Sequence, residues 1–269
     1  MNQTQAAFRM NLLLVIFATL VAVNKTNADV VTDQIEYLDG DTVLEGHFAV
    51  PKNNTTDSLP GILLIHGWTG LQEYARDRAR QLAELGYVVF AADIYGKGIR
   101  PTNPRECAVQ AKVYRGDRTL FRRRLNLALD VLKSHRSVDD KRLGAIGYCF
   151  GGTGVIELLR SGADVAGVVS FHGGLDSPRP EDGKNIKGKL LICHGADDPH
   201  VHKEDIDALI TEMNQWKVDW QMISYGGAVH SFTQADAGND PSDGRAYNEA
   251  ADRRSWEHMK SFFNEVFGR

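Results

Sequence analysis

Hydrophobic residues along this chain alternate between short continuous runs and longer periodic segments. The continuous apolar runs predict strands buried on both faces, and the segments with apolar residues every three or four positions predict helices. Regular alternation of the two predicts a mostly parallel central sheet with helices on both faces. The predicted strands are Gly61–Ile65, Tyr87–Ile94, Leu143–Ile146, Val165–Phe171, Lys189–Cys193 and Trp220–Tyr225, and the predicted helices are residues 71–85, Asp117–His135, Gly151–Ser161, His202–Trp216 and Ala246–Phe267.

A different pattern precedes the first buried run. Val30–Tyr37 and Val43–Val50 alternate apolar and polar residues on either side of the turn residues Asp39, Gly40 and Asp41. This pattern predicts an antiparallel hairpin. A hairpin that leads into a parallel α/β sheet is the plan of the α/β-hydrolase fold, which we expect for one domain over residues 29–269.

The N-terminal apolar run Asn11–Val23 has 13 residues, too few for a membrane span, which needs roughly 20. Arg9 precedes it, and small residues occupy the outer positions of Thr26–Ala28. This pattern predicts a secretory signal peptide over residues 1–28 that is removed before Asp29. A buried N-terminal helix and an uncleaved anchor remain the alternatives. We therefore expect a protein exported to the periplasm or outside the cell, with no membrane attachment after cleavage.

The charge pattern of the chain argues against nucleic acid as a partner. The formal net charge is −4, the pI is about 6.1, and basic and acidic residues are interspersed. No stretch favours nucleic-acid binding, and the densest basic run, Arg122–Arg124, lies in a predicted helix whose charges we expect to face solvent. The expected partner is a small molecule, with the chain a monomer or a small homo-oligomer.

Candidate chemistry begins at Gly147-Tyr148-Cys149-Phe150-Gly151, directly after a predicted strand. The pattern is that of a nucleophile elbow, a tight strand-to-helix turn, with cysteine in place of the commoner serine. Glycine is needed on both sides because the turn leaves no room for side chains there. The elbow predicts Cys149 as a nucleophile at the carboxyl edge of the sheet, with the Phe150 N–H beside it.

In this fold an acid and then a histidine follow the nucleophile, each in a loop after a strand. The strand Lys189–Cys193 is followed by Asp197 and Asp198, and either carboxylate meets that requirement. The strand Trp220–Tyr225 is followed by His230. One histidine among nine is more often structural, but the order and loop position of His230 favour a catalytic role. Such a base would activate the thiol, whose free pKa is about 8.5.

The loop His66-Gly67-Trp68 follows the first buried strand and is expected to supply a second donor for an oxyanion, with the Trp68 N–H as the candidate. His194, His200 and His202 lie close to the candidate acid, but their spacing matches no common zinc pattern. We expect no metal and no cofactor.

Four segments of the chain resemble the dienelactone hydrolase family, and the resemblance extends from about Val30 to the C-terminus. These segments are Gly147–Gly152, Gly195–Pro199, Gly86–Tyr87 with Ala92–Gly96, and His230–Phe232. The resemblance implies a triad of Cys149, Asp198 and His230, donors from Trp68 and Phe150, and hydrolysis of small lactones or esters without a cofactor. It also selects Asp198 over Asp197, which is expected to be a turn residue.

Two features depart from the family pattern. Gly67 stands where well-studied members carry a glutamate that controls the resting cysteine, and Glu73 is the nearest acid after it. The predicted export is the second departure, because enzymes of this type that degrade aromatic compounds work in the cytoplasm. Both favour a general esterase over an enzyme dedicated to dienelactone.

Other functions remain open from the residues alone. Thioesters or other acyl compounds are alternative substrates, and a non-catalytic binding protein with this fold or a redox sensor at Cys149 are alternatives of other classes. We further expect one of Arg100, Arg115 and Arg118 to pair with a carboxylate of the substrate.

Overall fold

The computed structural model describes residues 30–52 and 58–268, so the predicted signal peptide lies outside the described residues. The strands in this part of the chain form one sheet in the order β1-β2-β4-β3-β5-β6-β7-β8. β3 to β8 run parallel, while β1 and β2 form an antiparallel hairpin that joins β4 in antiparallel fashion. The predicted architecture is confirmed.

The observed bounds differ from the predicted ones by a few residues at most elements. The strands are β1 Val30–Asp39, β2 Thr42–Pro51, β3 Leu59–Ile65, β4 Val88–Ala92, β5 Val138–Tyr148, β6 Gly167–Phe171, β7 Lys189–Gly195 and β8 Trp220–Tyr225. The helices are α1 Glu73–Glu84, α2 Pro104–Gly116, α3 Arg118–Ser134, α4 Phe150–Arg160, α5 Lys203–Gln215 and α6 Glu249–Val266.

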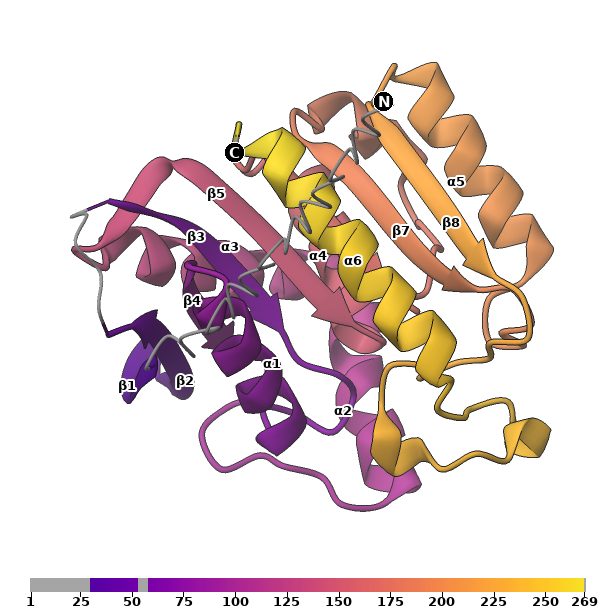
Figure 1. Ribbon diagram of the computed structural model, residues 1–269, viewed down its shortest axis with the longest axis horizontal. Helices are drawn as coiled ribbons and strands as arrows, with labels where there is room; N and C mark the ends of the chain where they lie inside the picture. Colours follow the sequence, from indigo (N-terminus) through magenta and orange to yellow (C-terminus); the bar gives the residue numbers. More distant parts are fainter. Residues whose placement is uncertain (1–29, 53–57, 269) are drawn as a thin grey trace, which may run out of the picture.

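Helices cover both faces of the sheet, as Figure 1 shows with α1 and α6 in front and α3 and α4 behind. Two hydrophobic clusters correspond to the two faces. One packs side chains of α1 and α6, such as Leu82 and Phe263, against the sheet, and the other packs side chains of α3 and α4, such as Phe121 and Leu158. Strands β3, β4 and β6 and the second half of β5 are almost wholly buried, as expected for strands covered on both sides.

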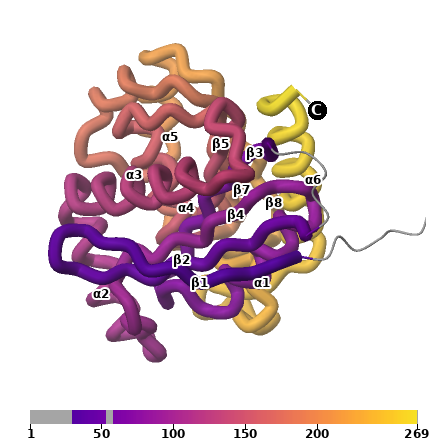
Figure 2. Tube along the Cα trace, turned by 90° about the vertical axis from the view of Figure 1, so that its left-hand side faces the viewer, coloured from indigo at the N-terminus to yellow at the C-terminus, as the bar shows by residue number. Residues whose placement is uncertain are grey.

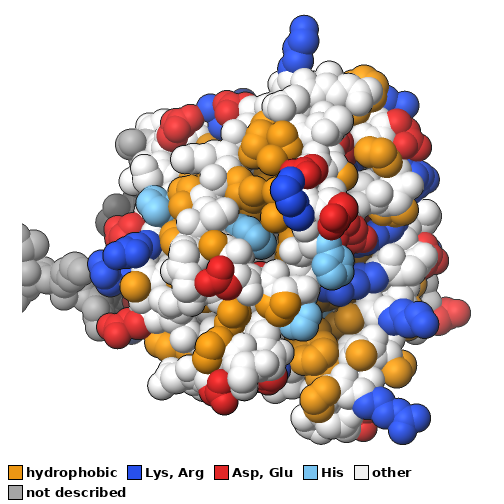
Figure 3. Space-filling view, turned by 90° about the vertical axis from the view of Figure 1, so that its right-hand side faces the viewer, with side chains coloured by type: hydrophobic (Ala, Val, Ile, Leu, Met, Phe, Trp, Pro, Cys, Tyr) orange, Lys and Arg blue, Asp and Glu red, His pale blue; other side chains and the backbone are white. Residues whose placement is uncertain are grey.

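The hairpin closes one edge of the sheet and crosses the front of the molecule in Figure 2. On the opposite side, which carries β8 and α5, acidic and basic side chains are intermixed (Figure 3). No helix within the described ranges is both long and apolar enough to cross a membrane.

One helix, α2, is absent from the predicted elements. Asn103 caps it by accepting a hydrogen bond from the Glu106 N–H at 3.0 Å, and Pro104 occupies its first turn. Cap and proline are a recognisable start signal. The buried face is thin, with Cys107, Ala111 and Tyr114 as its members, and so the apolar periodicity is weak.

The expectation that Arg122–Arg124 face solvent is wrong for two of the three residues. Arg124 is buried and pairs with Asp39 at the end of β1, and Arg122 donates to the buried Glu157 of α4 at 2.8 Å. Only Arg123 is largely exposed. A sequence window around α3 does not contain these carboxylates, so the pairing is set by the tertiary fold.

Candidate active site

The chain turns sharply between β5 and α4, and Cys149 occupies the turn. Its backbone has φ 55° and ψ −112°, a strained conformation for a residue with a side chain. A Cβ at Gly147 would lie 2.0 Å from the Gly151 carbonyl oxygen, and one at Gly151 would lie 2.2 Å from the carbonyl oxygen of Ile65. Glycine is therefore required at both positions, and the turn holds Cys149 at the carboxyl ends of the strands.

Three side chains from separate loops form one hydrogen-bonded line. His230 Nε2 lies 3.0 Å from Cys149 Sγ, and His230 Nδ1 lies 2.8 Å from Asp198 Oδ2. All three residues are less than one-tenth exposed. We call Cys149, His230 and Asp198 the candidate triad. This is the geometry in which a carboxylate orients an imidazole that activates a nucleophile.

The structure also separates the two carboxylates that the sequence offered. Asp198 is buried, and its second oxygen accepts the His200 N–H at 2.9 Å. Asp197 is exposed and accepts the Gly227 N–H at 3.1 Å, which ties two loops together. Asp198 contacts the imidazole, while Asp197 has the structural role expected of a turn residue.

Burial and the charge of His230 shift the pKa of the Cys149 thiol in opposite directions. Burial raises the pKa of Cys149, but the charge and hydrogen bond of His230, with smaller contributions from Arg115 and the Phe150 N–H, bring it below its ordinary value. Burial lowers the pKa of His230, and Cys149 and Asp198 outweigh this effect and raise it to about 10. Both shifts favour the thiolate–imidazolium form of the pair over a neutral thiol beside a neutral imidazole.

The loop after β3 is held by His66, which is completely buried. Its Nε2 accepts the Ile94 N–H at 3.2 Å, so Nδ1 carries the proton and donates to the Gly67 carbonyl oxygen at 2.6 Å. This fixes the peptide plane that contains the Trp68 N–H. Trp68 also lines the cavity beside Cys149. The loop thus presents a rigid backbone next to the Phe150 N–H.

A cavity of about 630 Å³ opens over the candidate triad. Its polar lining includes Lys112 and Arg115 from α2 and Arg245 from the loop after His230. Arg245 has a buried Nε with no hydrogen-bond partner among the described residues. Asp176 and Asp205 are the acidic residues of the cavity lining, so the basic side chains outnumber the acidic ones, which suits a substrate with a negative group.

Of the three arginines expected near the substrate, only Arg115 lines this cavity. Arg118 is buried and pairs with Asp176 at 2.5 Å. Arg100 donates to the carbonyl oxygens of Leu71 and Gly96 and holds a loop together. The expectation that one of the three pairs with the substrate therefore rests on Arg115, because Arg100 does not line the cavity and Arg118 reaches it only by its ion pair with the lining residue Asp176.

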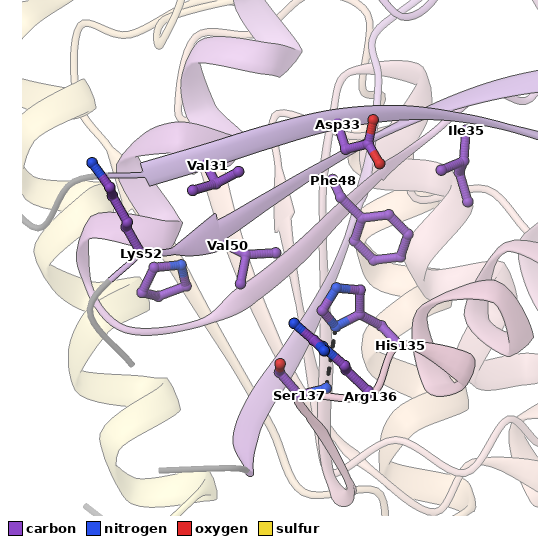
Figure 4. Close-up of a pocket in the computed structure, with 10 residues that line it drawn as sticks. Val31, Asp33, Ile35, Phe48, Val50, Lys52, His135, Arg136 and Ser137 are labelled. Carbon is purple, nitrogen blue, oxygen red and sulfur yellow. Dashed lines mark hydrogen bonds between the residues drawn. The ribbon is translucent and has the colours of Figure 1, made fainter. Parts of the chain in front are cut away.

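A second cavity, of about 770 Å³, lies between the hairpin and the start of β5 (Figure 4). Phe48 and His135 pack against each other there, with ring centroids 4.8 Å apart. This cavity is at the amino end of β5, whereas Cys149 follows its carboxyl end. The candidate triad does not line it, so the chemistry belongs to the first cavity.

The two residues that the sequence offered in place of the glutamate of the family pattern do not take its role. Gly67 occupies the loop position, and Glu73 is an exposed residue of α1 that pairs with Arg80 at 2.6 Å. Within residues 30–52 and 58–268, no group of three or more histidine, cysteine or acidic residues is arranged to hold a metal ion.

Comparison with known proteins places this chain in a family. The model of the dienelactone hydrolase family matches residues 44–267. The chain belongs to this family. Its fold is the α/β-hydrolase fold, and the protein is a hydrolase of the dienelactone hydrolase type.

Two solved structures and one curated relative illustrate the similarity. The structure named m3DLH is 41% identical with a TM-score of 0.85, and the match covers 88% of this chain and 98% of that one. P91, described as a dienelactone hydrolase-like promiscuous phosphotriesterase from metagenomic libraries, is 38% identical with a TM-score of 0.83, at 88% and 98% coverage. A "Putative carboxymethylenebutenolidase" of Saccharolobus solfataricus is 25% identical over 257 residues, which cover 83% of this chain and 94% of the relative.

Sequence reasoning missed two residues at the site of this family member. Arg245 follows His230 by 15 positions and pairs with it in an isolated β-bridge. His172 follows β6 and packs its ring against His230. The loops of Asp198 and His230 were found because each follows a predicted strand. The same signal marks His172, which directly follows β6.

The paired state of the thiol predicts an unusual pH dependence of its alkylation. Thiolate is present above the lowered pKa of Cys149 and is lost as the pH falls through it, while the imidazolium persists up to about pH 10. We expect iodoacetamide to alkylate Cys149 with a midpoint below the ordinary thiol value of about 8.5. In His230→Ala the midpoint should lie above that value, because burial then outweighs the smaller contributions of Arg115 and the Phe150 N–H.

Stopped-flow alkylation followed by peptide mass mapping measures this directly. Cys149→Ser is the control, since it retains Cys107 and Cys193 and should lose the fast adduct. Equal midpoints in the native protein and His230→Ala would show that His230 does not ionise the thiol.

Proposed function

We propose that this dienelactone hydrolase-type enzyme cleaves small carboxylic esters or lactones by acyl transfer to Cys149 and then to water. The observation that carries the proposal is the line of hydrogen bonds from Asp198 through His230 to the Cys149 sulfur, at 2.8 and 3.0 Å. Its position at the floor of a cavity gives a substrate access to the sulfur.

The proposed first step forms a bond from the Cys149 sulfur to the carbonyl carbon of the ester. The carbonyl electrons move to oxygen, and the N–H groups of Phe150 and Trp68 stabilise the resulting oxyanion. When the oxyanion collapses, the bond to the alcohol oxygen breaks and His230 gives that oxygen its proton. The products of this step are an alcohol and a thioester on Cys149.

In the second step, neutral His230 takes a proton from water while the water oxygen attacks the thioester carbonyl. Collapse of this second oxyanion releases the carboxylic acid and restores the thiolate–imidazolium pair. Asp198 stabilises the positive imidazole throughout and keeps its Nδ1–H directed away from the sulfur. No redox partner is needed, because no atom changes oxidation state.

Removing the sulfur tests the reaction. We expect Cys149→Ala to lose about four orders of magnitude or more in kcat/KM toward p-nitrophenyl acetate, since nucleophile and general base act as one unit. Rapid-quench mass spectrometry of the native enzyme should find the acyl group on Cys149. Full activity of Cys149→Ala would refute the proposal.

A panel of short esters, lactones, thioesters and amides then ranks the substrates, with thioesters as the alternative class. A phosphotriester belongs in the panel because P91, at 38% identity, is described as a promiscuous phosphotriesterase. Preference for thioesters over oxygen esters would move the assignment to a thioesterase.

The cations of the cavity predict a preference for esters that carry a second, ionised carboxylate. We expect Arg115→Gln and Arg245→Gln each to lower kcat/KM for such a substrate by about 10- to 100-fold, the value of a hydrogen bond to a charged group. A neutral ester of the same size should change little, which also corrects for the influence of Arg115 on the thiol. Arg105→Gln, an exposed arginine of the same helix, is the matched control. Equal losses for both substrates would remove these arginines from substrate selection.

We also propose that residues 1–28 direct export, as their sequence pattern suggests. Expression of the full chain in a bacterium with fractionation should recover a mature protein that begins near Asp29 outside the cytoplasm. N-terminal sequencing checks this, and an intact N-terminus in the cytoplasmic fraction would contradict it.

A further inference from the structure

The loop that carries His230 leaves β8 and has one strained residue directly after the imidazole. Ser231 has φ 59°, a left-handed conformation that side chains disfavour. The next two residues, Phe232 and Thr233, are buried. A strained backbone persists only where its surroundings hold it, so the contacts of this loop decide where the His230 ring lies.

His172 is the residue that packs directly against that ring. It follows β6, is completely buried, and is itself left-handed at φ 39°. Its N–H donates to the Cys193 carbonyl oxygen at 2.9 Å, which anchors it between β6 and β7. Its ring meets the His230 ring edge-on, with centroids 5.3 Å apart and planes at 66°. His200 meets the His230 ring at 5.2 Å and 89°.

A chain of buried hydrogen bonds continues from His172. Its Nε2 lies 2.8 Å from Thr233 Oγ1, which lies 2.7 Å from the Tyr74 hydroxyl. His172 Nδ1 has no partner within the described part of the chain. An unmet acceptor is better tolerated than an unmet N–H, so Nε2–H donates to Thr233, and Thr233 in turn donates to Tyr74.

Arg78 of α1 completes the chain. It donates to the Tyr74 hydroxyl at 3.2 Å and to the Thr233 carbonyl oxygen at 3.0 Å, and it pairs with Asp252 of α6 at 2.6 Å. Its guanidinium lies 5.2 to 5.8 Å from the ring centres of Tyr74, Tyr148 and Trp256. Both ends of the hydrogen-bonded chain are thus fixed, one by the sheet and one by two helices.

The surroundings of His172 favour its neutral form. Burial lowers its pKa well below the ordinary value, and the charges of His230 and Arg78 lower it further. The ring of Tyr148 from β5 faces it from another side, at 6.0 Å. His172 therefore stays neutral and does not compete with His230 for the proton.

We propose that His172, Thr233, Tyr74 and Arg78 form a buried clamp that holds the His230 imidazole within hydrogen-bond reach of Cys149. A catalytic role for the clamp rests on the proposed function. Its effect on the pKa of Cys149 does not, because that effect is present in the resting protein. These four are positioning residues, because none of them touches Cys149 or the cavity in which the substrate would lie.

The test is the pH dependence of Cys149 alkylation in variants that break one bond of the clamp. Thr233→Val keeps the shape of the side chain and removes its hydroxyl, and Tyr74→Phe does the same for the phenol. An imidazole that is held less firmly pairs less well with the Cys149 sulfur. We therefore expect the midpoint of the alkylation profile to rise by about 0.5 pH unit or more. At a pH below the midpoint, this shift makes alkylation roughly 3-fold slower. Arg78→Lys, which keeps the charge but loses the forked contact, should show an intermediate rise.

A residue that only stabilises the fold would lower the melting temperature without moving this midpoint. Ile62→Val, a conservative change in the buried strand β3, provides that comparison. An unchanged midpoint in folded Thr233→Val and Tyr74→Phe, or an equal rise in Ile62→Val, overturns the clamp. Should Thr233→Val fail to fold, Tyr74→Phe decides the question.

Ester turnover of the same variants separates the clamp from the proposed function. If both hold, kcat for p-nitrophenyl acetate falls with the thiolate fraction while KM changes little. A shifted midpoint in a protein that hydrolyses no ester of the panel supports the clamp and refutes the function. Ester turnover that depends on Cys149, together with an unshifted alkylation midpoint in the variants, supports the function and refutes the clamp.

Discussion

The close contact of two backbone segments at Gly147 and Gly151 is the constraint on which the site depends. Because the chain passes within contact distance of the Ile65 carbonyl there, β5 stops and α4 starts within one residue. The cysteine between them is held in a strained conformation at the carboxyl edge of the sheet. In a parallel sheet the loops that follow β3, β6, β7 and β8 all begin at that same edge. One tight turn therefore brings the sulfur to the place where all the other groups already meet.

A buried thiol is a poor nucleophile unless a charge compensates for its burial. Here burial raises the pKa of Cys149, and His230 reverses that effect. The imidazolium is itself disfavoured by burial and depends on Asp198 and the thiolate. Burial disfavours both the thiolate and the imidazolium, and each is favoured by its neighbour, so the candidate triad is one electrostatic unit. The precision with which the imidazole is placed then matters more than the strength of any single contact.

The sequence was sufficient to predict the features that each depend on one local pattern. Buried strands were visible as apolar runs. Cys149, His230 and the pair Asp197 and Asp198 were found because each follows a predicted strand, and the family resemblance then selected Asp198. Features that depend on distant pairings were not predictable in this way. The buried pairs of Arg122 and Arg124 involve carboxylates from α4 and β1. Helix α2 shows no clear period because it carries apolar residues on its exposed side as well as on its buried side. Arg245 belongs to an irregular loop, where no periodicity marks a functional side chain.

The replacement of a controlling glutamate by Gly67 changes what limits the reactivity of this cysteine. The resting Cys149 sulfur already lies 3.0 Å from His230 Nε2, so the imidazole can ionise it before a substrate arrives. Because the lowered pKa of Cys149 depends on His230 and not on a bound substrate, the thiol can react with whatever enters the cavity. Selection must then come from the cavity itself, from its cations and its size, and from the fixed donors of the Trp68 loop. In this protein, control of the reaction thus moves from the nucleophile to the walls around it.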